Sequence, residues 1–382
     1  MQTLPPYITK IIDTFEKNGY QAYAVGGCVR DMLLGKKPDD YDITTNCKPE
    51  KVLELFEKTI PTGIKHGTIT VLEDGNVVEV TTFRKDGDYS DNRSPDTVLF
   101  VDELSQDLSR RDFTINAFAY KGDKIIDLFG GTKDLKNKTI RAIGNPNERF
   151  NEDALRILRA FRFAAKLNFK IESNTFNAIK ENAVLLKNIS VERIFSELSK
   201  ILLTDNTFVL DDLVGSRCLE HLDIRKIGNS KLLSALPNDL AIRFVAFCHL
   251  ANVSAYKTAV LLKCDNRLKE YSKKADSLKD FSFTNDKVSF KSAMALTSFQ
   301  SVKDFLIIQN LIFDQKHNLS LIDEIKNNNE PYKIEHLKIS GDEIKEFGLS
   351  GKEIGRTLQG LLEDVIKNPQ NNQKEKLKNK VT

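Results

Sequence analysis

The chain has 382 residues, of which 40% are hydrophobic and 29% are charged, and these values fit a globular protein. No apolar run approaches the roughly 20 residues that a membrane span requires. The formal net charge of +3 is too small to indicate nucleic-acid binding by bulk charge, so any such partner must be held by local basic patches. The length allows about two to four compact units of roughly 100 to 200 residues each.

The first residues and the cysteines indicate the compartment. The start of the chain has neither an apolar signal region nor the Arg-rich amphipathic pattern of a transit peptide. The cysteines form no Cys-x-x-Cys pair and have no zinc-ligand spacing, so we expect reduced core residues. They are Cys28, Cys47, Cys218, Cys248 and Cys264. We therefore expect a cytoplasmic protein that has no membrane segment.

The pattern of apolar residues divides the chain in two. It predicts a helix over residues 5–18 and then strands and short helices that alternate up to about residue 144. The predicted strands are 21–25, 41–44, 67–72 and 77–83, and the predicted helices are 29–34 and 50–58. From residue 151 onward helical periodicity dominates, first over 153–167, 175–186 and 191–203. Breaks rich in Asn and Lys at 326–331 and 368–380 indicate a separate tail and a frayed end.

Residues 24–42 carry the most informative motif. Gly26 and Gly27 lie between a predicted strand and a predicted helix, where the backbone N–H groups favour an anion such as phosphate. Asp40 and Asp42 flank one tyrosine at strand spacing, so both carboxylates are expected on one face, where they can share divalent cations. Each half alone also fits an ordinary turn or a solvated pair of aspartates. In this order they match the requirements of two-metal nucleotidyl transfer.

Residues 110–116 place Arg110, Arg111, Asp112 and Asn116 around the apolar Phe113 and Ile115. Arginine suits bidentate phosphate contact, and Asp or Asn can hydrogen-bond a ribose hydroxyl. An ion pair at the edge of a strand is the alternative interpretation.

Residues 151–162 contain Asp153 and Arg156, which share a face if the segment is one helix and then form an ordinary surface ion pair. A second interpretation is base recognition. Cytosine and adenine both present an amino donor beside a ring-nitrogen acceptor, which a carboxylate and a guanidinium would match, whereas uracil and guanine would leave the two charges unpaired. Arg159 and Arg162 follow on the same predicted helix, where Arg159 is a candidate phosphate contact and Arg162 fits a nucleotide contact or a solvated position.

Residues 82–95 form a polar, charged segment after a predicted strand, as expected of a mobile functional loop or of a simple hairpin connection. The loop carries Arg84, Asp86 and Arg93, and Gly87 permits bending. One pocket that accepts two bases in turn must re-aim its hydrogen-bonding groups, and we expect this loop to do so by engaging Asp153 and Arg156.

Taken in order, these segments resemble the motif series of class II CCA-adding enzymes, which are tRNA nucleotidyltransferases of the DNA polymerase β superfamily. The matching segments are 26–31 with 40–42, 110–116, 127–131, 152–156 and 190–193. The resemblance implies an α+β fold, in which a polymerase β-like nucleotidyltransferase head precedes an all-helical neck, body and tail. The boundaries expected are 1–144, 145–205, 206–330 and 331–382. The implied activity is addition of CCA to tRNA from CTP and ATP without a nucleic-acid template.

The resemblance also implies residue roles. Asp40 and Asp42 would hold Mg²⁺, and Asp153 with Arg156 would read the base. The remaining expected nucleotide contacts are Gly26, Gly27 and Arg30 at the triphosphate, Arg111, Asp112 and Asn116 near the ribose, and Arg159 and Arg162 along the helix. Glu192 and Arg193 are expected to support the base-reading turn, while Glu79 fits either a position near the metals or a solvent-facing strand position.

Related enzymes have other products, so alternatives stay open. Residues 62–71 resemble the CCA-adding version of this segment more than that of bacterial poly(A) polymerases, and the loop after Arg84 is not shortened as in CC-adding enzymes. Residues 339–344 and 351–355 resemble the tail helices that would bind tRNA, or an ordinary helical hairpin. A poly(A), CC-adding or A-adding polymerase and a non-catalytic RNA-binding relative are the alternative functions.

Overall fold

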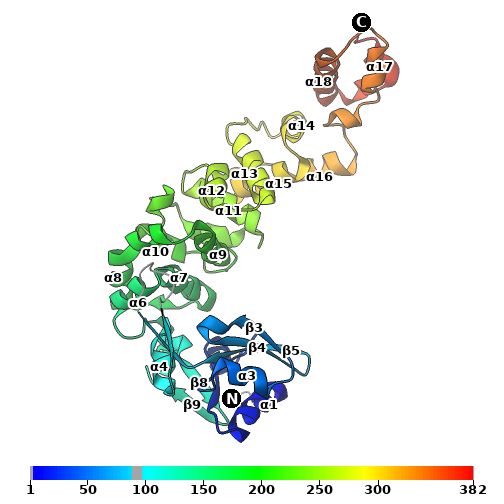
Figure 1. The fold of residues 1–382 in the computed structure, drawn as a ribbon. Coiled ribbons are helices and arrows are strands. Elements are labelled where there is room, and N and C mark those ends of the chain that lie inside the picture. Colours follow the sequence, from blue (N-terminus) through cyan, green and yellow to red (C-terminus); the bar gives the residue numbers. More distant parts are fainter. Residues whose placement is uncertain (1–2, 88–96, 382) are drawn as a thin grey trace. The chain divides into compact units, whose positions relative to one another are not determined.

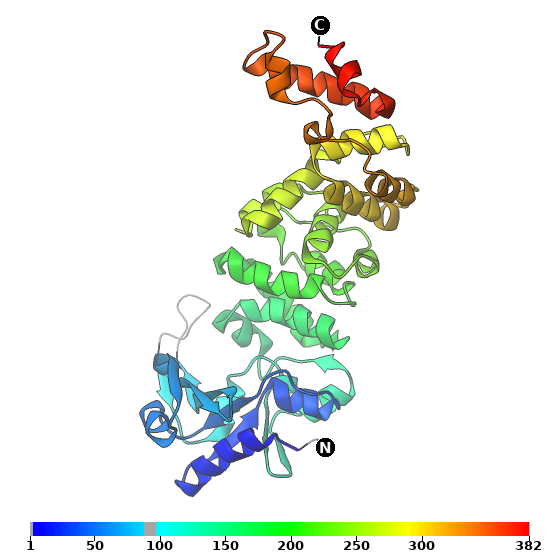
Figure 2. The same ribbon diagram turned by 90° about the vertical axis from the view of Figure 1, so that its right-hand side faces the viewer.

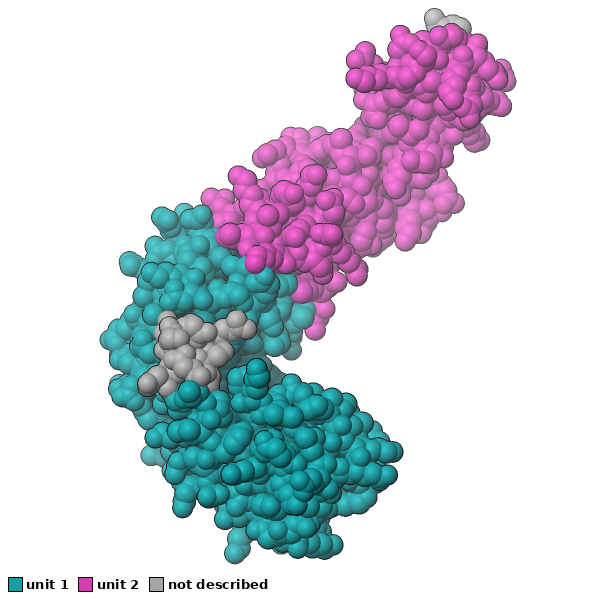
Figure 3. Space-filling model, viewed as in Figure 1, with its two compact units in different colours: residues 1–226 teal, residues 227–382 magenta. Residues whose placement is uncertain are grey.

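The computed structural model describes residues 3–87 and 97–381. The chain forms two compact units, residues 1–226 and 227–382, coloured teal and magenta in Figure 3. The finer division into head, neck, body and tail stays a prediction.

A mixed sheet of seven strands, counted over the described residues, dominates the first half of unit 1 (Figure 1). The strand order is β3-β4-β5-β2-β1-β8-β9, and only the β2–β5 pair is parallel among the pairs of this sheet. The strands are β1 (Ala22–Val25), β2 (Asp42–Thr45), β3 (Thr59–Gly63), β4 (Thr68–Glu73), β5 (Asn76–Thr82), β8 (Phe118–Lys121) and β9 (Lys124–Asp127). Two small ladders pair β6 (Arg84–Asp86) with β7 (Val98–Phe100) and β10 (Thr139–Ile140) with β11 (Lys170–Ile171).

Helix α1 (Pro6–Lys17) packs its apolar stripe against this sheet and lies beside it in both views (Figures 1 and 2). Helices α2 (Gly27–Leu33) and α3 (Pro49–Leu55) contribute to the same core. The turn between β4 and β5 contains Asp74 and Gly75, both with positive φ, as a tight type I′ hairpin requires. Local sequence thus fixes the antiparallel pair that neighbours β2.

In the sequence, the other α-helices of unit 1 lie between the strands of the sheet or after the last of them. They are α4 (Leu104–Ser109), α5 (Gly131–Lys136), α6 (Pro146–Glu152), α7 (Leu155–Leu167), α8 (Ser173–Asn182), α9 (Val191–Leu202) and α10 (Val209–Gly215). A short 3₁₀ turn, η2 (Thr114–Asn116), precedes β8. The expected α+β fold, in which a head with a sheet precedes a helical remainder, is confirmed.

The described residues of unit 2 form helices that are joined by turns and loops, and they include no strand. Its helices are α11 (Leu240–Leu250), α12 (Ala255–Leu261), α13 (Asn266–Ser277), α14 (Lys287–Leu296), α15 (Phe299–Ile312), α16 (Leu319–Asn327), α17 (Gly341–Lys345), α18 (Lys352–Lys367) and α19 (Lys374–Lys378). One hydrophobic cluster joins α14, α15 and α16, and another joins α17, α18 and α19. Among the described residues, no single helix is long and apolar enough to cross a membrane. Helices α11 and α12, which meet at a bend, reach that length and apolarity only when they are taken as a pair.

The expected continuous helix from residue 153 is wrong at its first turn. Asp153 has extended φ and ψ of −135° and 103° and separates α6 from α7. Its carboxylate accepts a hydrogen bond from the backbone N–H of Leu155 at 3.1 Å. An aspartate side chain that binds a free N–H at a helix start favours such a break over helix continuation.

Candidate active site

One cavity of unit 1 brings together the residues assigned to metal and nucleotide binding. Its volume is about 560 Å³, and its walls come from α2, the loop before β2, the turn around η2, α7 and the start of α9. Every residue that the sequence analysis assigned to metal or nucleotide binding lines it, namely Gly26, Gly27, Arg30, Asp40, Asp42, Arg111, Asp112, Asn116, Asp153, Arg156, Arg159 and Arg162. The cavity is also lined by Asp31, Asp39, Arg110, Leu155, Phe163, Lys166 and Arg193.

The two glycines allow guanidinium groups to lie against the backbone. Gly26 has φ of +77° and ψ of −131°, a conformation that is strained for any residue with a Cβ atom. A Cβ on Gly26 would lie 3.0 Å from Nη1 of Arg111, and a Cβ on Gly27 would lie 3.4 Å from Nη2 of Arg30. The glycines therefore serve two purposes here, since they form the turn and leave room for two cationic side chains.

Gly26→Ala should weaken nucleoside triphosphate binding by about tenfold or more, because the new Cβ strains the backbone and displaces Arg111. Gly19→Ala is the matched control, since Gly19 has φ of +82° but a Cβ added there would meet no atom within 4 Å. Both variants should lose stability in thermal unfolding, whereas only Gly26→Ala should lose nucleotide affinity in a direct binding assay. Equal nucleotide affinities for the two variants would show that Gly26 serves only the turn.

Asp40 and Asp42 lie close together, although only Asp42 belongs to a strand. Asp42 is the first residue of β2 and pairs in register with Glu79 of β5, while Asp40 lies in the preceding loop. Asp42 keeps contact with solvent, but burial of its carboxylate and the negative charges of Asp40 and Glu79 raise its pKa to about 6, against the opposing charge of Arg111. The negative charge at this end of the cavity is thus crowded.

This donor set fits a divalent cation. Crowded carboxylates are stabilised when a cation binds between them, and a hard cation such as Mg²⁺ is commonly held by one or two carboxylates together with substrate phosphates. Among the described residues no group of three or more His, Cys, Asp or Glu side chains is arranged to hold a metal. Asp40 and Asp42 would therefore need oxygen ligands from the substrate or water to complete the coordination.

A buried hydrogen-bond network lies beside the glycine turn. Asp112 accepts hydrogen bonds from Nε of Arg159 at 2.8 Å and from Nδ2 of Asn116 at 3.0 Å. Asn116 in turn accepts a hydrogen bond from Nη1 of Arg30 at 2.6 Å. Burial alone would raise the pKa of Asp112, but the positive charge of Arg159 and these hydrogen bonds lower it to about 2. Asp112 is therefore a fixed negative charge that orients Arg159.

Two expectations for this region need correction. Residues 114–116 form a 3₁₀ turn, so the strand in the alternative interpretation is wrong, whereas ion pairs are present: Arg110 and Arg111 pair with Asp107, and Asp112 pairs with Arg159. Arg162 is not solvated: its side chain is 17% exposed, and its Nε lies 2.7 Å from the carboxylate of Glu197 on α9. The helical register alone did not show that α9 supplies a carboxylate to this face of α7.

Asp153 and Arg156 both line the cavity but have separate partners. Arg156 is buried, forms an ion pair with Glu152, and donates from Nη2 to the carbonyl of Arg110 at 3.0 Å. Asp153 pairs with Nη2 of Arg193 at 3.2 Å. The interpretation that Asp153 and Arg156 form a surface ion pair on one helix is therefore wrong. These contacts are consistent with the predicted support of the base-reading turn by Arg193.

Asp107 on α4 is an important residue that the sequence analysis missed. Its side chain is completely buried, and its carboxylate accepts a hydrogen bond from Arg110 at 2.7 Å and one from Arg111 at 3.3 Å. The same carboxylate accepts a hydrogen bond from Thr44 on β2. Asp107 thus links the two arginines to the strand that carries Asp42. Asp107 precedes Arg110 by three residues and Arg111 by four, and this helical spacing indicates such contacts from the sequence alone.

The described part of the predicted loop, residues 82–87, lies next to the cavity without lining it. Arg84 and Asp86 belong to β6, and Arg93 lies outside the described residues. The carboxylate of Asp86 lies 3.8 Å from Nη1 of Arg110. Because the carbonyl of Arg110 accepts from Arg156, the base of the loop is connected to one of the two predicted base-reading residues.

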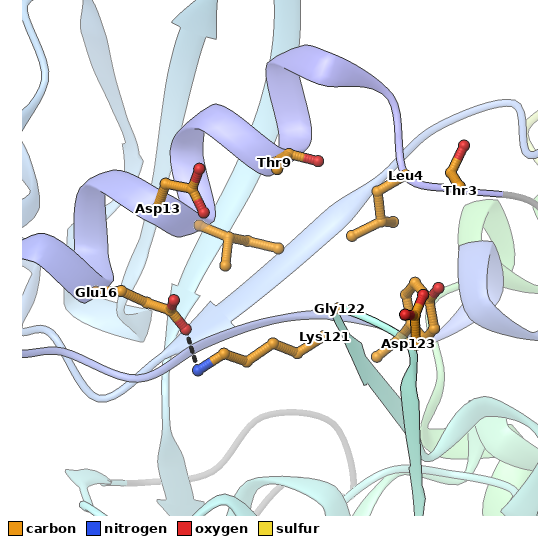
Figure 4. A pocket seen from close by; sticks show the side chains of 10 residues that line it. Thr3, Leu4, Thr9, Asp13, Glu16, Lys121, Gly122 and Asp123 are labelled. Carbon is orange, nitrogen blue, oxygen red and sulfur yellow. Dashed lines mark ion pairs between the residues drawn. The ribbon is translucent and has the colours of Figure 1, made fainter.

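Another cavity of unit 1, of about 310 Å³, lies between α1 and the β8–β9 hairpin (Figure 4). Asp13, Glu16 and Asp123 line it, and Lys121 forms an ion pair with Glu16. No residue that the sequence analysis assigned to the site lines this second cavity.

Comparisons with known proteins bear on both halves of unit 1. Residues 22–141 match the family model described as "Poly A polymerase head domain", and residues 168–222 match "Probable RNA and SrmB-binding site of polymerase A". The CCA-adding enzyme of Ligilactobacillus salivarius strain UCC118 is 36% identical, with 96% of this chain and 94% of that protein covered. The CCA-adding enzyme of Lactococcus lactis subsp. lactis strain IL1403 is 40% identical, with 96% and 94% covered.

The fold agrees with these relatives. The crystal structure of the CCA-adding enzyme of Bacillus stearothermophilus in complex with CTP matches with a TM-score of 0.76 and 30% sequence identity, covering 97% of this chain and 96% of that chain. Since the likeness in sequence and in fold extends over nearly the whole length, the chain belongs to the family of CCA-adding enzymes, which are tRNA nucleotidyltransferases.

Proposed function

We propose that this protein adds CCA to the 3′ end of tRNA from CTP and ATP, with Mg²⁺ as the metal. The observation that carries the proposal is that one cavity combines the aspartate pair, the arginine-lined glycine turn and the Asp153 and Arg156 side chains. The substrates and the product predict a cytoplasmic location, where tRNA and nucleoside triphosphates occur.

Each group of residues has a proposed task. Asp40 and Asp42 hold the metal, which when bound supplies activation of the attacking hydroxyl and neutralisation of the triphosphate charge. Arg30, which lies against Gly27 in the glycine turn, binds the triphosphate, because guanidinium groups make bidentate contacts with phosphate. Arg111, Asp112 and Asn116 lie near the ribose and orient it.

Base choice is assigned to Asp153 and Arg156. The carboxylate accepts from the amino group of cytosine or adenine, and the guanidinium donates to the neighbouring ring nitrogen. Uracil and guanine present a carbonyl and a ring N–H at these positions, so both protein charges would lose their partners. The contacts of Arg156 with Glu152 and of Asp153 with Arg193 keep the two groups in place for this selection.

The activity is tested with tRNA that ends at the discriminator base. With Mg²⁺, we expect CTP alone to add two nucleotides, ATP alone to add none, and both together to add three, as resolved by size. Chelation of the metal should abolish all addition. A long A ladder, a stop after two nucleotides with both substrates, or no incorporation would each contradict full CCA addition.

Asp86→Ala should slow addition of the terminal adenosine by about tenfold while addition of the two cytidines stays within about twofold. The reason is that Asp86 connects the loop to Arg110 and so to Arg156, which must be re-aimed between bases. Lys85→Ala is the matched control, since Lys85 is an exposed residue of the same strand. Equal rates of adenosine addition in the two variants would show that Asp86 takes no part in the change from cytidine addition to adenosine addition.

Removal of residues 335–382 should weaken tRNA binding by about tenfold and reduce its salt dependence, since phosphate contacts by Lys and Arg release counterions. These residues supply almost all of the second hydrophobic cluster of unit 2. CTP affinity should be unchanged, because the cavity lies wholly in unit 1. Unchanged tRNA affinity at every salt concentration would show that the tail has another role.

A further inference from the structure

Three arginines of the cavity surround one aromatic ring. The guanidinium carbon of Arg162 lies 4.3 Å from the ring centroid of Phe163, that of Arg159 lies 5.3 Å away, and that of Arg30 lies 5.4 Å away. Arg159 and Arg162 come from the same helix as Phe163, whereas Arg30 comes from α2. The ring is therefore the contact that these guanidinium groups share.

The arginines are otherwise held by different partners. Arg30 donates to Asp31 and Asn116, Arg159 donates to Asp112, and Arg162 pairs with Glu197. Gathering like charges has a cost, because burial and the nearby charge of Arg159 lower the pKa of Arg162 despite its carboxylate partner. The electron-rich face of an aromatic ring attracts guanidinium groups and so offsets part of this repulsion.

The ring itself is fixed and faces the site. Phe163 is 6% exposed and lines the cavity, and the fully buried Phe113 meets it edge-on with ring centroids 5.9 Å apart. One of the three guanidinium groups, that of Arg30, lies against Gly27 in the turn assigned to phosphate. The ring thus lies on the side of the cavity where the triphosphate is placed.

We infer that Phe163 is a positioning residue that holds Arg30, Arg159 and Arg162 in place to bind the triphosphate of the incoming nucleotide. The inference rests on the proposed function for the identity of that nucleotide. Phe163 acts through the arginines and does not itself contact the reacting atoms.

The test compares Phe163→Leu, which removes the ring but keeps an apolar side chain, with Phe163→Tyr, which keeps the ring. Phe161→Leu is the matched control, because Phe161 is fully buried in the same helix and packs against Phe176. Affinities for CTP and for CMP are measured directly in the absence of tRNA, so the result does not depend on nucleotide transfer. Thermal unfolding is measured for all variants.

Phe163→Leu should weaken CTP binding by about tenfold, which equals about 1.4 kcal/mol, and change CMP binding by less than about twofold. In CCA addition KM for CTP should rise with little change in kcat. Phe163→Tyr should restore CTP affinity, and Phe161→Leu should lose stability without losing CTP affinity. If Phe163→Leu does not fold, Phe163→Met fills the position with a flexible apolar side chain.

The inference would be overturned if Phe163→Leu lost CTP affinity and CMP affinity equally. It would also be overturned if the CTP affinities of Phe163→Leu and Phe161→Leu agreed within about twofold. A parent protein that binds CTP with the predicted dependence on Phe163 but adds no CCA would contradict the proposed function alone. A parent protein that does not bind CTP would overturn the inference.

Discussion

Asp40→Asn and Asp42→Asn should each reduce nucleotide incorporation by at least about a hundredfold, because loss of a metal-binding charge should raise the barrier by several kcal/mol. The fold should be unaffected. Burial of the Asp42 carboxylate, together with the negative charges of Asp40 and Glu79, raises the pKa of Asp42, so its charge is disfavoured in the folded protein and a neutral amide at either position relieves repulsion. We therefore expect both variants to be as stable as the parent in thermal unfolding, or slightly more stable.

The measurement is single-turnover addition of CTP to tRNA, with tRNA affinity determined in parallel. Asp13→Asn is the control, since Asp13 lies on α1 and lines the other cavity (Figure 4). Glu79→Gln shows whether the carboxylate beside Asp42 in the sheet also serves the metal, in which case its loss should raise the Mg²⁺ concentration required. Retention of more than about one per cent of the activity in either Asp variant would contradict the metal-binding assignment.

Asp153→Ala and Arg156→Ala should change which nucleotide is used. Loss of either partner removes the penalty against uracil and guanine, so incorporation of UTP or GTP relative to CTP should rise by about tenfold to a hundredfold. Binding of tRNA should change much less. Competition between nucleotides on tRNA that lacks CCA measures this ratio directly.

Arg193 provides a stricter test of the same assignment. If it acts only by holding Asp153, Arg193→Ala should relax nucleotide choice in the parent but have little further effect when Asp153 is already alanine. Additive effects in the double variant would assign Arg193 an independent role. Unchanged nucleotide choice in all three single variants would leave Asp153 and Arg156 with a structural role only.

Much of the fold could be predicted because local signals and tertiary packing agree. The apolar stripe of α1 and the turn at Asp74 and Gly75 favour the observed elements without distant contacts. Strands β3, β8 and β9 were missed. Strand β8 is buried apart from its last residue, so it lacks the alternation that identifies a half-exposed strand.

Membership of the cavity could also be predicted, because each motif keeps its members within a few residues along the chain. The partners of the charges could not be predicted in the same way. Asp112 with Arg159 and Glu197 with Arg162 join segments 35 to 47 residues apart, and these pairs depend on how α7 packs against the turn around η2 and against α9. Asp107 is different, since its spacing before Arg110 and Arg111 was readable from the sequence.

The proposed function requires that one protein cavity selects cytidine twice and then adenosine. To measure this selection, the parent protein and Mg²⁺ are incubated with tRNA that lacks CCA and equal concentrations of all four nucleoside triphosphates, and the 3′ ends are sequenced. We expect products that end in CCA and are not extended further. Products that end in CC, carry runs of A, or contain U or G at these positions would show that the cavity does not make this selection.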